Sequence, residues 1–174
     1  MTAPLLVRLS THDRALMLRC AMSPAATRLS RLSWVAVTHL GGTAASLLAA
    51  GLPLLACCEL YQAGELAMTT LVISHLLVQL VKRTVGRGRP SFDCDLSAII
   101  REPDRFSFPS GHATASFAVA LSYSVVFPRW SGPLLLVAAL VGFSRIRLAV
   151  HYPSDVVVGQ LLATLTLIAL IGVR

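Results

Sequence analysis

The chain has 174 residues, of which 55% are hydrophobic and 13% charged, and its mean hydropathy is +0.72. This balance excludes an ordinary soluble globular surface and predicts a polytopic membrane protein of one domain. The formal charge of +7 comes from 15 basic and 8 acidic residues. The basic residues lie outside the apolar stretches and favour anionic lipid headgroups or phosphate-bearing ligands, whereas nucleic acid is disfavoured because no basic groove interleaved with aromatic residues accompanies them.

Residues 1–32 form a basic N-terminal segment in which arginines alternate with short apolar runs, at Arg8, Arg14, Arg19, Arg28 and Arg31. The pattern predicts an amphipathic helix lying on the membrane surface, and a partly disordered basic tail is the alternative. The apolar runs are too short for a cleavable signal peptide, so we expect the first span to act as an uncleaved insertion signal.

Five apolar stretches follow, at about residues 34–58, 66–81, 110–126, 133–143 or beyond, and 154–173. About 20 apolar residues cross a bilayer as a helix, and only helices and closed barrels satisfy their backbone there. The predicted fold is therefore all-α: a polytopic membrane bundle of about five transmembrane helices in residues 33–174, preceded by the interfacial helix. We expect Pro53 to kink the first span and residues 59–65 to form a tight polar turn.

Four cysteines show neither metal-ligand spacing nor a disulfide framework, at Cys20, Cys57, Cys58 and Cys94. Two of them are adjacent inside an apolar stretch, where thiols pack as small hydrophobic groups. We therefore expect inert thiols, with no metal and no cofactor.

Polar residues gather in three short segments. Lys82–Pro90 closes the second span, Pro109–His112 opens the third, and Ser144–Asp155 joins the fourth to the fifth. Following the chain back and forth places all three segments on the same membrane face. The long charged connection of residues 82–108 cannot itself span a membrane, and connections of this length are usually functional. These segments therefore predict one composite site.

The basic residues of these segments predict an anion site. Lys82, Arg89 and Arg145 would repel one another at the edge of a low-dielectric slab unless an anion lay between them. Ser110 is a suitable helix N-cap and Gly111 permits close backbone approach, so the free N–H groups of this helix start can also bind a phosphate.

Two histidines and an aspartate complete the predicted chemistry. His151 can attack phosphorus if a carboxylate holds its other ring N–H, and Asp155 lies four residues further on. His112, in the first turn beside the anion, can protonate a leaving oxygen. The alternative is a structural hydrogen bond between His151 and Asp155 at a helix start.

The three segments resemble the signature of the type 2 phosphatidic acid phosphatase superfamily, with the family's spacing inside each motif. Six residues separate Lys82 from Arg89-Pro90, and Pro109-Ser110-Gly111-His112 forms the second motif. In the third motif, five residues separate Ser144-Arg145 from His151, and three separate His151 from Asp155. The resemblance implies a helical bundle and metal-independent hydrolysis through a phosphohistidine. It implies His151 as nucleophile, Asp155 as its orienter and His112 as acid, with the phosphate held by Lys82, Arg89, Ser110, Gly111 and Arg145.

The resemblance leaves the substrate open among phosphatidic acid, phosphatidylglycerol phosphate and polyprenyl pyrophosphates. The family's soluble vanadium-dependent haloperoxidases are disfavoured by five apolar spans. A lipid phosphotransferase and a non-catalytic lipid-phosphate-binding membrane protein are the alternatives to a lipid phosphatase. The absence of asparagine, and so of glycosylation sequons, and the arginine-rich tail favour a bacterial inner membrane. The distribution of basic residues favours an active site on the cytoplasmic face of the membrane. Many bacterial members of the family act on the outer face, so both faces stay open. The oligomeric state also stays open.

Overall fold

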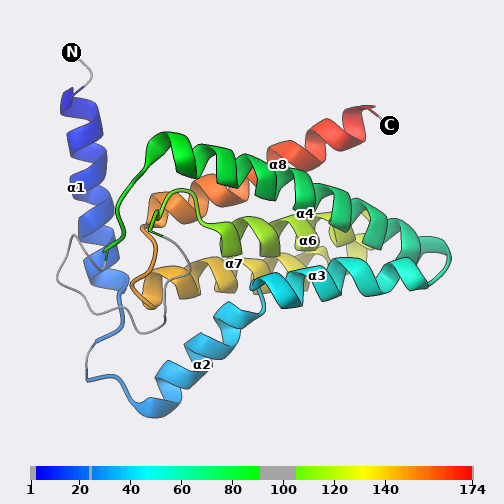
Figure 1. Ribbon diagram of the computed structural model, residues 1–174. Coiled ribbons are helices and arrows are strands. Elements are labelled where there is room, and N and C mark those ends of the chain that lie inside the picture. The colour runs from blue at the N-terminus through cyan, green and yellow to red at the C-terminus, as the bar shows by residue number, and fades with distance from the viewer. Residues whose placement is uncertain (1–2, 24, 91–104, 174) are drawn as a thin grey trace.

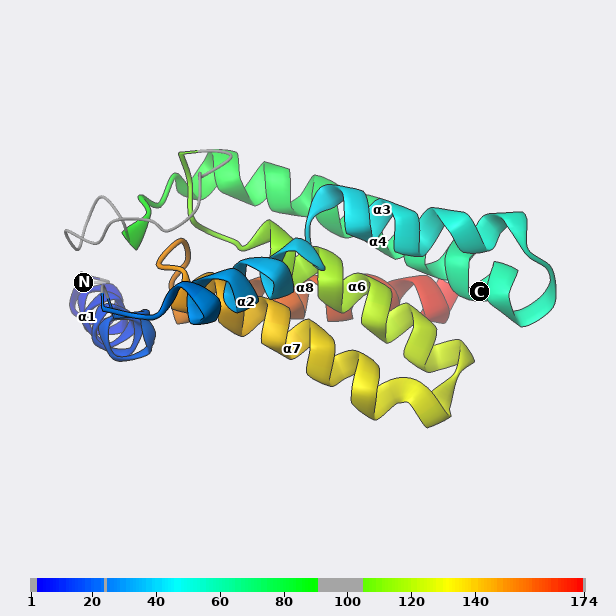
Figure 2. The ribbon, with the colours of Figure 1, turned by 90° about the horizontal axis from the view of Figure 1, so that it is seen from below.

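The computed structural model describes residues 3–23, 25–90 and 105–173, and the described chain is helical without strands. Its α-helices are α1 (Ala3–Cys20), α2 (Arg28–His39), α3 (Thr43–Gly51), α4 (Cys58–Val85), α6 (Gly111–Val126), α7 (Ser131–Arg147) and α8 (Pro153–Val173). Two short 3₁₀ turns, Leu52–Leu55 and Pro128–Trp130, precede α4 and α7. In Figures 1 and 2, α4, α6, α7 and α8 run along the molecule, and α1 stands across one end. The predicted all-α class is confirmed.

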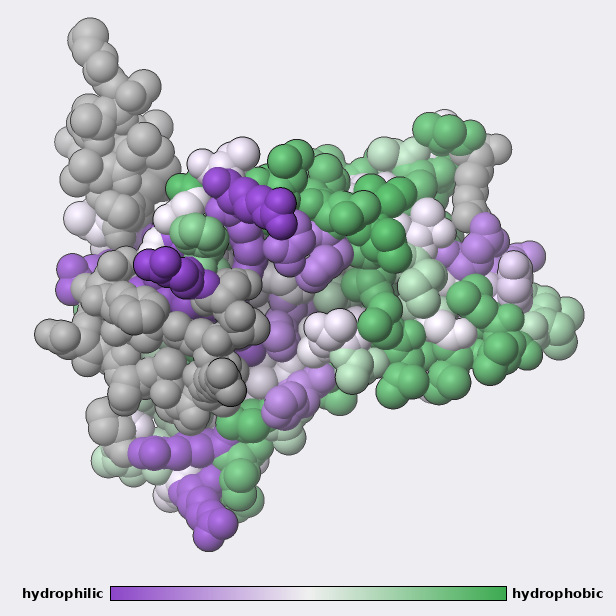
Figure 3. Space-filling model, viewed as in Figure 1, coloured by the Kyte–Doolittle hydropathy of each residue, from purple (hydrophilic) through white to green (hydrophobic). Residues whose placement is uncertain are grey.

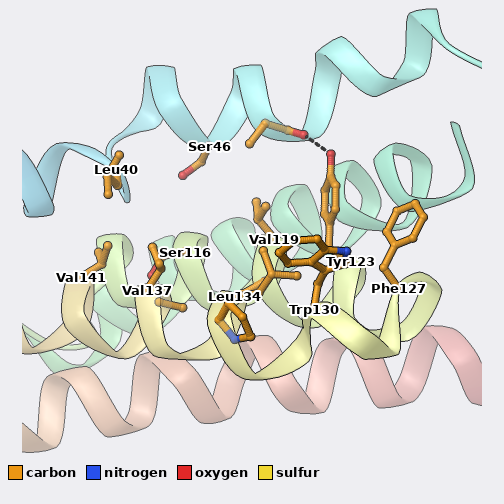
Figure 4. Close-up of a pocket in the computed structure, with 14 residues that line it drawn as sticks. Leu40, Ser46, Ser116, Val119, Tyr123, Phe127, Trp130, Leu134, Val137 and Val141 are labelled. Carbon is orange, nitrogen blue, oxygen red and sulfur yellow. Dashed lines mark hydrogen bonds between the residues drawn. The ribbon is translucent and has the colours of Figure 1, made fainter. Parts of the chain in front are cut away.

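The helix α6 lies at the centre of the bundle and packs against α4, α7 and α8. Its buried face consists of small residues, among them Ala113, Ala118 and Ser122. Small residues let helix backbones approach closely, which is how helices associate where no water drives them together. On the α3 side, the Tyr123 hydroxyl donates a hydrogen bond of 2.8 Å to the Ala49 carbonyl, shown dashed in Figure 4.

The predicted first span, residues 34–58, is broken in the structure. The helices α2 and α3 are bent by 45° at Leu40–Gly42. A Cβ atom on Gly41 would lie 2.4 Å from Val141 Cγ1 and 2.9 Å from the His112 carbonyl oxygen. The break therefore brings backbone against α6 and α7 where no side chain fits, and it places Thr38 and Gly42 beside the polar end of the bundle.

The predicted polar turn at residues 59–65 is wrong. These residues lie inside α4, and the chain turns earlier, through the 3₁₀ segment that contains Pro53. Leu, Gln, Ala and Glu are good helix formers, and Glu59 in the first turn of α4 favours the positive end of the helix dipole. Gly64 packs closely against Pro53: a Cβ atom on Gly64 would lie 2.8 Å from Pro53 Cβ, so a larger residue would not fit there.

The described helices supply two or three candidate membrane spans. By length and hydropathy α4 and α8 can each cross a membrane, and the bent pair of α2 and α3 with its 3₁₀ turn would be a third. The predicted third, fourth and fifth spans coincide with α6, α7 and α8, but α6 has only 16 residues and α7 only 17. Figure 3 shows hydrophobic side chains over much of the bundle and hydrophilic ones gathered mainly at the end near α1.

The thiols of Cys20, Cys57 and Cys58 are free, and Cys94 lies outside the described residues. Most of the long charged connection, residues 91–104, also lies outside them.

Candidate active site

A cavity of about 620 Å³ opens between α3, α4 and α6. Its polar end is lined by Lys82, Arg89, Gly111, His112, Arg145 and His151. Its other end is lined mainly by aliphatic side chains of α3 and α4, such as Leu47, Leu71 and Leu76. His75, Gln79 and Lys82 also line the cavity from α4, and His75 contacts Gln79 through their Nε2 atoms at 3.2 Å. The three polar segments of the sequence therefore meet in one place.

Three buried cations reach the polar end from three parts of the chain. Lys82 lies in the last turn of α4, and its Nζ donates to the Phe106 carbonyl at 3.4 Å. Arg89 follows Gly86, whose positive φ of 63° ends α4, and its Nη1 donates to the Val150 carbonyl at 2.8 Å. Arg145 lies in the last turn of α7. Buried positive charges at one cavity end form a strong anion site, and guanidinium forks suit phosphoryl oxygens.

His151 lies in the short connection between α7 and α8. The chain reverses there through Ala149, whose φ is 62°, and the N–H groups of Val150 and His151 both donate to the Arg145 carbonyl. The imidazole is 2% exposed. Burial, followed by the charges of Arg145, Arg89 and Lys82, holds the pKa of His151 well below its ordinary value of 6.5. The imidazole is therefore neutral at neutral pH, which is the form that can attack phosphorus.

Asp155 lies in the first turn of α8, facing His151. Its Oδ2 is 3.5 Å from His151 Nδ1, which is longer than a hydrogen bond, and accepts one of 2.8 Å from the Tyr152 N–H. Its Oδ1 accepts a hydrogen bond of 2.9 Å from Arg87 Nη1. The carboxylate is thus placed to orient the imidazole, and catalytic hydrogen bonds often tighten only when substrate binds.

The N-terminus of α6 faces the same end of the cavity. Ser110 occupies the N-cap position, but its hydroxyl makes no capping bond and is buried without a hydrogen-bond partner in the described chain. Its backbone N–H instead donates to the Asp155 carbonyl at 2.9 Å. A Cβ atom on Gly111 would meet nothing within 4 Å, which leaves room beside the helix start. This is the arrangement of an anion site at a helix N-terminus.

Residues 65–174, more than half of the chain, match the PAP2 superfamily. The chain belongs to the PAP2 superfamily. This confirms the resemblance carried by the three motifs. Solved structures agree on the fold: a PAP2-type phosphatidylglycerolphosphate phosphatase from Bacillus subtilis superposes with a TM-score of 0.78, at 23% identity, over 95% of this chain and 85% of the other.

Two curated PAP2 relatives are similar over about half of this chain. A lipid A 1-phosphatase from Rhizobium etli is 37% identical over 101 residues, which are 55% of this chain and 44% of the relative. A decaprenylphosphoryl-5-phosphoribose phosphatase from Mycolicibacterium smegmatis is 41% identical over 90 residues, which are 50% of this chain and 47% of the relative. The chain thus spans about half the length of the curated relatives it matches.

Two residues that are not signature positions also support the site. Thr38 Oγ1 accepts a hydrogen bond of 2.7 Å from Arg145 Nη1. Arg87 contacts Asp155 and is one of the six residues between Lys82 and Arg89. Arg83 lies in the same stretch, so the sequence alone does not single out Arg87.

A second cavity, of about 450 Å³, lies between α3, α6 and α7 (Figure 4). Its lining is almost wholly apolar, including Val119, Tyr123 and Trp130, and it shares Ser46 with the first cavity. It contains none of the predicted site residues.

Proposed function

We propose that the protein is an integral membrane lipid phosphatase of the bacterial inner membrane, whose catalytic domain is residues 33–174. One observation carries the proposal: two histidines and three buried cations line the polar end of a cavity whose other end is lined mainly by aliphatic side chains. A lipid can leave its tail among the aliphatic side chains of α3 and α4 while its phosphate reaches the charged end. A soluble phosphate ester would need no such apolar wall.

The reaction proceeds in two balanced steps. Lys82, Arg89 and Arg145, with the helix start at Ser110 and Gly111, bind the phosphoryl oxygens. The negative charge of the bound phosphate favours the imidazolium form of His112. His151 Nε2 attacks phosphorus, the bond to the leaving oxygen breaks, and His112 transfers its proton to that oxygen. Asp155 stabilises the positive charge that develops on His151. His112, now neutral, takes a proton from water, the hydroxide displaces His151 from phosphorus, and inorganic phosphate leaves. The protein's contribution is mainly positioning and charge stabilisation, and no step requires a metal.

The cavity and the relatives' names support a substrate class. The named relatives act on lipid A and on a decaprenyl-linked sugar phosphate, both of which carry phosphate on a membrane-embedded lipid. The aliphatic wall formed by Leu71 and Leu76 suits such hydrocarbon, whether acyl or polyprenyl. We therefore propose a terminal phosphate or pyrophosphate on a long-chain lipid as substrate.

The test is phosphate release by the full-length purified protein in detergent. The panel contains phosphatidic acid, phosphatidylglycerol phosphate, undecaprenyl pyrophosphate and lipid A, each with and without EDTA and vanadate. We expect release from at least one lipid that survives EDTA and falls with vanadate, a phosphate analogue. Release that stops with EDTA would contradict the metal-independent mechanism. Transfer of phosphate to an added alcohol in preference to water would make the protein a phosphotransferase, and no release from any lipid would contradict the phosphatase proposal.

Replacing Gly159 with alanine is expected to lower kcat by roughly tenfold to a hundredfold, because catalysis depends on sub-ångström placement of the reacting groups. A Cβ atom there would lie 2.7 Å from the Ser110 carbonyl oxygen and 2.8 Å from Thr114 Oγ1, so α8 must move away from the start of α6. Gly172→Ala on the same helix is the matched control, because its Cβ meets nothing within 4 Å. Equal kcat values for the two variants would show that this close approach does not set the site geometry.

A further inference from the structure

An acidic residue outside the PAP2 match reaches the catalytic connection. Asp13 lies on α1 and is 7% exposed. Its Oδ1 accepts a hydrogen bond of 3.0 Å from the Ser154 N–H, and its Oδ2 accepts bonds from the Ser154 hydroxyl and, at 2.6 Å, from Arg87 Nη2. These three hydrogen bonds offset the free-energy cost of burying the Asp13 carboxylate, which would be large without partners.

Arg87 joins Asp13 to the proposed catalytic carboxylate. One nitrogen, Nη2, pairs with Asp13, and the other, Nη1, donates to Asp155 Oδ1 at 2.9 Å and to the Ser154 hydroxyl at 2.7 Å. The guanidinium lies 4.0 Å from the centre of the Tyr152 ring, which fixes its plane. A continuous chain of charged contacts therefore runs from Asp13 through Arg87 to Asp155, which faces His151.

The position of α1 is fixed by further contacts with the same connection. Met17 is fully buried and packs against Ala149 and Tyr152. Just after α1, the Met22 N–H donates to the Arg147 carbonyl at 2.9 Å, and Arg147 Nη1 donates to the Cys20 carbonyl at 3.0 Å. Figure 1 shows α1 standing at the end of the bundle where α7 passes into α8. The N-terminal segment is therefore packed onto the connection that holds His151, whatever its relation to the membrane surface.

We infer that Asp13 and Arg87 are positioning residues for the catalytic Asp155, so that α1 is part of the catalytic apparatus; this inference rests on the proposed function. Arg87 uses only one of its nitrogens on Asp155 and binds only Oδ1, which leaves Oδ2 facing His151 Nδ1. Asp13 holds the other nitrogen. Without Asp13, the guanidinium fork is free to pair bidentately with both oxygens of Asp155, as arginine and carboxylate prefer, and would draw Oδ2 away from the imidazole.

The consequence for kinetics is a selective loss of kcat. Asp13 touches neither the cavity nor the phosphate-binding cations, so substrate binding does not depend on it. In Asp13→Asn the amide keeps the shape but loses the charge that holds Arg87, and we expect kcat to fall about tenfold, as for other partners that orient a catalytic ligand. KM is expected to stay within about twofold of the wild-type value, because the contacts that bind the substrate are unchanged. Arg14→Gln, an exposed neighbour on the same helix, is the matched control and should retain wild-type kcat.

The decisive comparison is a double-mutant cycle on the full-length protein. Because Asp13 acts through Arg87, Asp13→Asn should lower kcat less than twofold in an Arg87→Gln background. If each residue had an independent structural role, the kcat of the double variant would fall by the product of the two single losses. A tenfold rise in KM with unchanged kcat, or multiplied losses in the double variant, would overturn the inference.

A second readout keeps this test separate from that of the phosphatase proposal. The rate at which diethyl pyrocarbonate modifies His151, followed by peptide mass spectrometry, requires no substrate. We expect Asp13→Asn to change this rate in the wild-type background but not in an Arg87→Gln background, and Arg14→Gln to leave it unchanged. A wild-type rate in Asp13→Asn would overturn the positioning role, even if no lipid in the panel were hydrolysed.

Discussion

Replacing His151 with alanine is expected to lower kcat by about 10⁴-fold, because the nucleophile is lost and only binding and charge stabilisation remain. The side chain is buried in the connection between α7 and α8, and its backbone N–H donates to the Arg145 carbonyl, a bond that alanine keeps. The variant should therefore fold and bind phosphate. The measurement is phosphate release from the preferred lipid, together with base-quenched labelling by a ³²P-phosphorylated substrate, since phosphohistidine survives base and is lost in acid.

The labelling distinguishes a nucleophile from a residue that only supports binding. The wild-type protein should carry an acid-labile label that maps to the peptide containing His151, and His151→Ala should carry none. His12→Ala, an exposed histidine on α1, controls for the loss of any imidazole and should keep wild-type turnover. If His151→Ala retains more than a tenth of wild-type kcat, or is still labelled, the phosphohistidine mechanism is wrong.

Replacing Arg145 with alanine is expected to lower kcat/KM by about 10²- to 10³-fold, the loss typical of removing one donor that stabilises charge in a transition state. Arg145 is 1% exposed, lines the cavity, and is held by Thr38 Oγ1 at 2.7 Å. The carbonyl that orders Val150 and His151 belongs to the backbone and stays in place. Initial rates over a range of lipid concentration in mixed micelles measure the effect.

Two further variants separate charge from geometry at this position. Arg145→Lys keeps the charge but loses the planar fork, and we expect it to lower kcat/KM about tenfold, an intermediate loss. Arg129→Ala removes an exposed arginine from the 3₁₀ turn before α7, at the other end of that helix, and should have no effect. If Arg145→Ala and Arg129→Ala behaved alike, the phosphate would not be bound by Arg145.

Much of the bundle was predictable because its signals are local. The apolar stretches that form α6, α7 and α8 are bounded by polar residues, Gly or Pro. A helix start such as Ser110-Gly111 is likewise encoded in a few neighbouring residues. The break between α2 and α3 was not predictable in the same way. It depends on Val141 and His112, more than 70 residues away in sequence, against which Gly41 packs. Residues 59–65 lie in α4 because their helix propensity outweighs the turn signal of their polar side chains.

By itself the sequence determined the all-α class, the family and the set of charged residues on one face, since motif spacing and the alternation of apolar stretches are properties of short segments. Only the tertiary structure decided which residues support that set. Nothing near Asp13 in the sequence indicates that it contacts Arg87 and Ser154, 74 and 141 residues further along the chain. Thr38 reaches Arg145 across 107 residues in the same way. Such contacts arise from the packing of whole helices, which brings together side chains that no local pattern connects.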